Sequence, residues 1–88
     1  MLIEERITKY LNVCDVAVSG EHGHSTTLRV AIALVHGFDI SPEEALPFFE
    51  TWNQGCMPPW NERDLMRKLR QADQLTPRSG KPRGYLLD

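Results

Sequence analysis

Residues 58–70 read Pro-Pro-Trp-Asn-Glu-Arg-Asp-Leu-Met-Arg-Lys-Leu-Arg, which joins a stiff turn to the start of a helix. The two prolines fix their own φ angles and disfavour helix before them. Asn61 is a residue type that caps helix N-termini, and Asp64 stands at N3 in a variant of the capping box. This stretch therefore predicts a helix that begins immediately after Asn61.

The predicted helix has an apolar face and a basic face. At about 100° per residue, Leu65, Leu69 and Ala72 fall on one side. Trp60, at N′, is expected to pack on Leu65 as a hydrophobic staple and so to fix the angle between turn and helix. The opposite arc holds Arg63, Arg67, Arg70 and Gln74. One face should pack inward while the other presents guanidinium groups to solvent.

Three more helices are predicted upstream. Residues 2–11 form a first one, with an apolar stripe of Ile3, Ile7, Tyr10 and Leu11. A second is expected from a cap at Ser25 or Thr26 to about His36, with Gly37 as a left-handed C′ residue. This helix is apolar almost all round, so it should be the buried centre of the fold.

The third helix has the clearest start. Ser41 is an N-cap residue, Pro42 stands at N1 and Glu44 stands at N3. Ala45, Phe48, Phe49 and Trp52 make its apolar stripe, and it should end between Asn53 and Gly55.

These patterns predict an all-α fold, a small four-helix domain with an irregular Gly/His loop between the first two helices. Short extended segments are expected near 14–18 and 84–87. Residues 1–75 form the helical domain, and 76–88 form a basic tail or linker that contains Pro and Gly. The apolar residues 84–87 are expected to dock back on the core near Val16.

Composition indicates a soluble, cytoplasmic protein without a membrane partner. Hydrophobic residues make up 41% of the 88 and charged residues 25%, and no apolar run of about 18 residues is present. The net charge of −2 divides into −5 over residues 1–60 and +3 over residues 61–88. This asymmetry allows an anionic partner at the C-terminal end.

The sequence argues against catalysis and against a cofactor. It has no Gly-rich loop ending in Lys-Ser or Lys-Thr, and its carboxylates are better explained by helix N-termini than by a two-metal site. Cys14, Cys56, His22 and His24 lack the paired short spacing of structural zinc sites, so no metal is expected.

The basic residues point to a phosphate backbone as the ligand. The histidine loop before the second helix is a weaker anion candidate, because a tight turn with locally packed histidines is the favoured explanation. Trp52 and Trp60 are better explained as packing residues than as base-stacking platforms. The candidate nucleic-acid-binding residues are Arg63, Arg67, Lys68, Arg70, Arg78, Lys81, Arg83, His22, His24 and Arg29.

The order of these signals resembles the primase C-terminal helical domain family. The resemblance covers about residues 2–75 and rests on the segment from Gly20 to Ser25, on Asn53, and on Pro58-Pro59-Trp60. His22 or His24 stands where that family commonly has Arg, and Ser25 where it commonly has Asn. Such domains accompany catalytic primase modules or helicase-like ATPases in replication proteins of plasmids, phages and other mobile elements.

The resemblance implies a noncatalytic accessory domain in DNA replication. Its expected partners are DNA, single-stranded or primer-template, and other domains of a primase or helicase. The alternative is a protein-protein interaction module that docks a neighbouring catalytic or ATPase domain, and a simple solvated face is also compatible with the arginines. A helix-turn-helix built from the last two helices is disfavoured, because the connection between them is too long.

Overall fold

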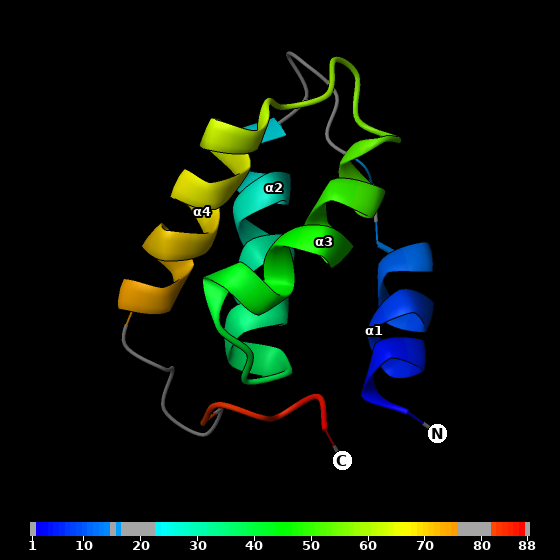
Figure 1. Cartoon of the computed structure of the whole chain (residues 1–88), viewed down its shortest axis with the longest axis vertical. Helices are drawn as coiled ribbons and strands as arrows, with labels where there is room; N and C mark the ends of the chain where they lie inside the picture. The colour runs from blue at the N-terminus through cyan, green and yellow to red at the C-terminus, as the bar shows by residue number, and fades with distance from the viewer. Residues whose placement is uncertain (1, 15, 17–22, 76–81, 88) are drawn as a thin grey trace.

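The computed structural model of the chain describes residues 2–14, 16, 23–75 and 82–87. Its elements are α1 (Ile3–Asn12), α2 (Gly23–Ile32), the π-helical turn η1 (Ala33–Gly37), α3 (Pro42–Asn53) and α4 (Glu62–Gln74) (Figure 1). The predicted all-α class with four helices is confirmed. Within the described residues no segment forms a strand, and 83–86 form turns instead of the extended segment expected near 84–87.

The centre of the fold is α2 with its continuation η1, as the apolar sequence predicted. Val30, Ala31, Leu34 and Val35 are each at most 4% exposed. In Figure 1, α3 and α4 lie against this central helix and α1 lies on the far side of α3 from α4. The buried side chains of all four helices form one core cluster.

The predicted start of α2 is wrong. The helix begins at Gly23, so Ser25 and Thr26 lie inside it and do not cap it. The fully buried Thr27 lies in this helix, and its hydroxyl donates to the Gly23 carbonyl at 2.7 Å.

The predicted left-handed Gly37 is also wrong. The residue in the left-handed region is Asp39, with φ 52°, and Gly37 is buried. Gly37 serves close packing instead: a Cβ there would lie 2.8 Å from Leu86 Cγ. The Phe38 N–H closes the π-helical turn on the Ala33 carbonyl at 3.1 Å.

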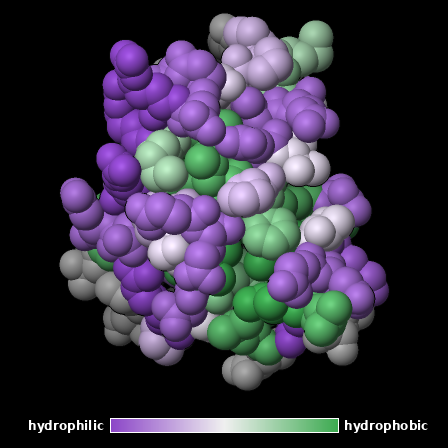
Figure 2. Space-filling model, viewed as in Figure 1, coloured by the Kyte–Doolittle hydropathy of each residue, from purple (hydrophilic) through white to green (hydrophobic). Residues whose placement is uncertain are grey.

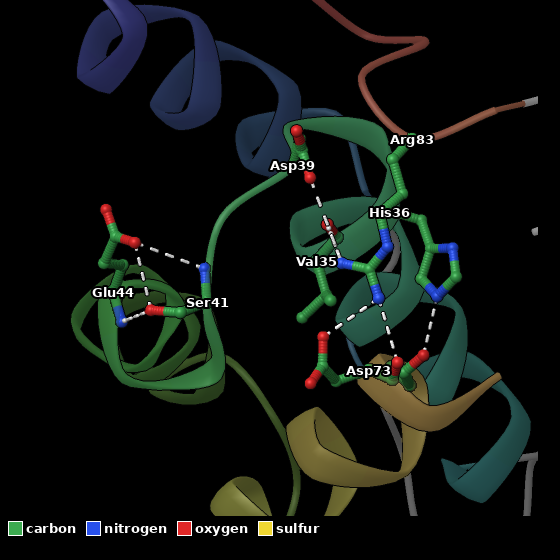
Figure 3. A network of polar contacts seen from close by, with 8 residues as sticks. Val35, His36, Asp39, Ser41, Glu44, Asp73 and Arg83 are labelled. Atoms are coloured by element: carbon green, nitrogen blue, oxygen red, sulfur yellow. Dashed lines mark hydrogen bonds and ion pairs between the residues drawn. The ribbon is translucent and has the colours of Figure 1, made fainter.

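The caps predicted for α3 and α4 are confirmed. The Glu44 N–H donates to Ser41 Oγ at 3.1 Å, and Glu44 Oε1 accepts from the Ser41 N–H at 3.4 Å, which completes the capping box (Figure 3). At the start of α4, Asn61 Oδ1 accepts from the Asp64 N–H at 2.8 Å. Both helix starts are therefore fixed by local sequence.

Residues 82–87 pack on the helical body, so the docking expected for residues 84–87 is confirmed, although its place differs from the one predicted. Gly84 N–H donates to the His36 carbonyl at 2.6 Å, and Leu86 N–H donates to the Gly37 carbonyl at 2.8 Å. Arg6 on α1 donates to the Leu87 carbonyl at 2.6 Å. The docking surface is thus the η1 end of the molecule and the start of α1, whereas Val16 lies beside Gly55 at the other end.

Candidate nucleic-acid interface

The outer face of α4 is set by the burial of its inner face. Leu65, Leu69 and Ala72 are at most 1% exposed, packed against α2 and α3. Because the helix turns about 100° per residue, the residues half a turn away must face solvent. This arrangement confirms the two-faced helix that the sequence predicted.

Three arginines share that outer face, which we call the arginine face: Arg63, Arg67 and Arg70. All three are exposed. They line a shallow depression of about 580 Å³ together with Met66, Gln71 and Gln74. The seven helical steps from Arg63 to Arg70 span about 10 Å of helix axis. Figure 2 shows that hydrophilic side chains cover the α4 side of the molecule.

The arginine face is only partly neutralised. Arg67 Nη1 lies 3.6 Å from Asp64 Oδ1, and the two side chains are 70% and 33% exposed. Such a solvent-exposed pair contributes about 0–1 kcal/mol and is screened by salt, so it does not compete strongly with a polyanion.

Lys68 lies to one side of the arginine face. Its Nζ is 5.7 Å from the centroid of the Trp60 ring, a cation–π arrangement. Trp60 is half-buried and packs against the core, which agrees with a packing role. Trp52 is 5% exposed and stacks on Phe49 at 5.4 Å, so it belongs to the core as expected.

The start of α4 is positioned by Asn53. The sequence marked this residue only as part of the family resemblance and predicted no contact for its side chain. Asn53 Oδ1 accepts from the Trp60 N–H at 2.8 Å, and Asn53 Nδ2 donates to the Trp60 carbonyl at 2.7 Å. These two bonds pin the residue before the N-cap to the end of α3. The signal in the sequence was an amide side chain at a helix end followed by a proline-rich turn.

The Arg83 guanidinium is engaged within the protein, at the C-terminal end of α4. Its Nη2 donates to the Asp73 carbonyl and to Asp73 Oδ1, both at 2.9 Å. Its Nη1 lies 3.5 Å from the Val35 carbonyl and 4.0 Å from Asp39 Oδ1 (Figure 3). The guanidinium therefore joins the C-terminal segment to the end of α4 and to η1.

Arg29 is not grouped with the arginine face. It is exposed on α2 and lines a hollow of about 260 Å³ with Tyr10, Val13 and Cys14 on the α1 side. His22, Arg78 and Lys81 lie outside the described residues, as does the side chain of His24. Among the predicted residues whose side chains the structure describes, it brings together Arg63, Arg67 and Arg70, with Lys68 at their flank.

The two cysteines occupy different environments. The Cys14 thiol donates to the Tyr10 carbonyl at 3.3 Å, and Cys56 is 2% exposed in the core. Among residues 2–14, 16, 23–75 and 82–87, no three His, Cys, Asp or Glu side chains gather as metal ligands would. None of the helices in this described part is both long and apolar enough to cross a bilayer.

No protein family, no curated protein and no solved structure matches this chain.

Proposed function

We propose that this chain is a noncatalytic accessory domain of a DNA-replication primase or primase-helicase, and that α4 binds single-stranded or template DNA through the arginine face. The observation that carries the DNA-binding part is the shared solvent exposure of Arg63, Arg67 and Arg70 along one side of α4. Guanidinium groups bind phosphate oxygens through charge-assisted hydrogen bonds. The replication context is supported by the motif order, from the Gly/His loop to Pro58-Pro59-Trp60.

The test is binding of a fluorescein-labelled single-stranded oligonucleotide, followed by anisotropy at several salt concentrations. Each phosphate contact contributes about −0.7 to the slope of log K against log salt for a single strand, so three arginines give a slope near −2. Reversing Arg67→Glu and Arg70→Glu together should weaken binding and reduce that slope by about 1.4.

The matched control reverses two exposed cations elsewhere, Lys9→Glu and Arg29→Glu, which changes the net charge by the same amount. This pair should retain most of the affinity. An equal loss in both double variants would show that the net charge governs binding, and it would refute an interface on α4. Unchanged binding by Arg67→Glu with Arg70→Glu would refute it as well.

The second candidate function is that of a module that docks another protein domain. It is favoured by apolar side chains that are exposed at the end of the molecule opposite the α3–α4 connection. Leu2 is 65% exposed, and Ile3 and Leu87 are each 38% exposed. The Arg6 bond to the Leu87 carbonyl holds α1 and the C-terminal segment together there, and Figure 2 shows apolar surface at its lower end. This candidate predicts that isolated-domain DNA binding is weak and vanishes at physiological salt.

A further inference from the structure

The arginine face carries neutral side chains as well as its three arginines. Met66, Gln71 and Gln74 line the same shallow depression. Both glutamines are exposed, and neither forms a hydrogen bond with another residue that the structure describes. A glutamine amide has donors on its nitrogen and an acceptor on its oxygen. The face therefore presents uncharged hydrogen-bonding groups beside its guanidinium groups.

The depression suits the edges of bases better than their faces. Among the described residues, neither a carboxylate nor an aromatic ring lines it. At about 100° per residue, the carboxylates of α4 fall outside this arc of the helix: Glu62, Asp64 and Asp73. Proteins that bind single strands without sequence preference stack the bases on aromatic side chains. Since no ring lines the depression, its amides are suited to hydrogen-bond with base edges.

The size and position of α4 allow it to enter a groove of duplex DNA. Its 13 residues span about 20 Å, and a helix with its side chains is about 10–12 Å across. The major groove of B-DNA is about 12 Å wide. Figure 1 shows α4 along one edge of the molecule, with α2 and α3, against which it packs, on its inner side. In the described part of the chain, the outer side of α4 is therefore open to a groove.

We propose that α4 lies in the major groove of duplex DNA, where Gln71 and Gln74 bind the edges of adenine bases and the arginine face binds the adjacent phosphates. This inference rests on the proposed function, because it uses the same face of α4. It names the duplex part of a primer–template as the ligand. Phosphate contacts then give position and affinity, while the amides give sequence preference.

Adenine is the base that these side chains fit. A glutamine amide can accept from adenine N6 and donate to adenine N7, a pair of groups that the base exposes in the major groove. Met66 lies in the same depression and offers an apolar contact for the methyl group of the paired thymine. A helix-turn-helix is not required for this mode, because α4 enters the groove alone.

The experiment selects duplexes with a randomised centre on the full chain and then measures affinity by anisotropy. The selected duplex should contain A·T pairs and should bind about tenfold more tightly than a scrambled duplex of the same composition, the effect of one bidentate base contact. Replacing the selected adenines by 7-deazaadenine should abolish this preference, because the N7 acceptor in the major groove is lost.

Gln71→Ala combined with Gln74→Ala should bind the selected and scrambled duplexes equally. The slope of log K against log salt should stay at the wild-type value, because no charge is changed. Alanine is a better helix former than glutamine, so α4 is retained in this variant. Gln54→Ala is the matched control, since Gln54 is an exposed glutamine outside α4, and it should keep the tenfold preference.

Three results overturn base reading by α4 alone: a selection that yields no preferred duplex, a preference that survives 7-deazaadenine, and a preference that survives the double glutamine variant. In each case, single-strand binding that still depends on Arg67 and Arg70 leaves the proposed function standing. Absence of binding to duplex and to single strand alike overturns the proposed function and the base reading together.

Discussion

Asn53 binds both backbone polar atoms of Trp60, accepting from its N–H at 2.8 Å and donating to its carbonyl at 2.7 Å. The amide is 8% exposed, so both bonds are shielded from water. This single side chain connects the end of α3 to the residue that precedes the cap of α4. The direction of the arginine face therefore depends on a contact between two residues that are seven positions apart in the chain, and not on α4 alone.

Replacing Asn53→Ala should lower the free energy of unfolding by about 2 kcal/mol, because the N–H and carbonyl of Trp60 lose their partners. Asn53→Asp should lie between the wild type and Asn53→Ala, since it keeps the acceptor and loses the donor. Urea unfolding monitored by tryptophan fluorescence measures both. Gln54→Ala is the control and should cost less than about 0.5 kcal/mol, because Gln54 is exposed.

Replacing Gly37→Ala should cost about 2 kcal/mol, because the new Cβ overlaps the Leu86 side chain. The same substitution in a Leu86→Ala background should cost much less, since the obstructing atoms are gone. A thermodynamic cycle of the four chains isolates this coupling. Equal costs in the two backgrounds would show that Leu86 does not pack on Gly37.

Replacing Arg83→Gln should reduce stability by about 1 kcal/mol, because its bonds to Asp73 are partly exposed and partly screened. The loss should be smaller in an Asp73→Asn background. DNA affinity should stay within about twofold, whereas Arg63→Gln should lower it further. A larger effect of Arg83→Gln on DNA binding than on unfolding would assign Arg83 to the DNA interface.

Burial raises the pKa of the Tyr10 hydroxyl above its usual range, with a further contribution from the nearby Cys14. The folded chain therefore holds this proton more tightly than the unfolded chain. The stability contributed by neutral Tyr10 is complete below about pH 10 and is lost as pH rises through the folded pKa. Urea unfolding between pH 8 and 11 should show this fall, and Tyr10→Phe should lessen it while keeping the edge-on contact with Phe38.

Much of the fold could be predicted because helix boundaries are often encoded locally. The capping box of Ser41 and Glu44 and the cap at Asn61 lie within three residues of the groups that they bind. The two faces of α4 follow from helical periodicity alone. The start of α2 was predicted wrongly this way, because Ser and Thr also occur inside helices, and Ser25 and Thr26 lie inside α2.

The candidate site likewise contains features that the local sequence predicts and features that depend on contacts between distant residues. The arginine face was predictable, since its three residues lie on one helix and share one period. The role of Arg83 was not, because its partners lie 10 and 48 residues away in the chain. The apolar character of residues 84–87 predicted that they dock on the core, but composition carries no information about where they dock or which groups Arg83 binds.

The sequence by itself determined the helical class, the caps of α3 and α4 and the grouping of Arg63, Arg67 and Arg70, because these depend on interactions within one or two helical turns. Only the tertiary structure decided that Arg83 closes the end of α4 and that Gly37 makes room for Leu86. It also decided that the buried His36 donates from Nε2 to the Ala72 carbonyl, at a distance of 2.7 Å. The physical reason is that each of these contacts joins groups far apart in the chain, and such groups meet only when the core has packed.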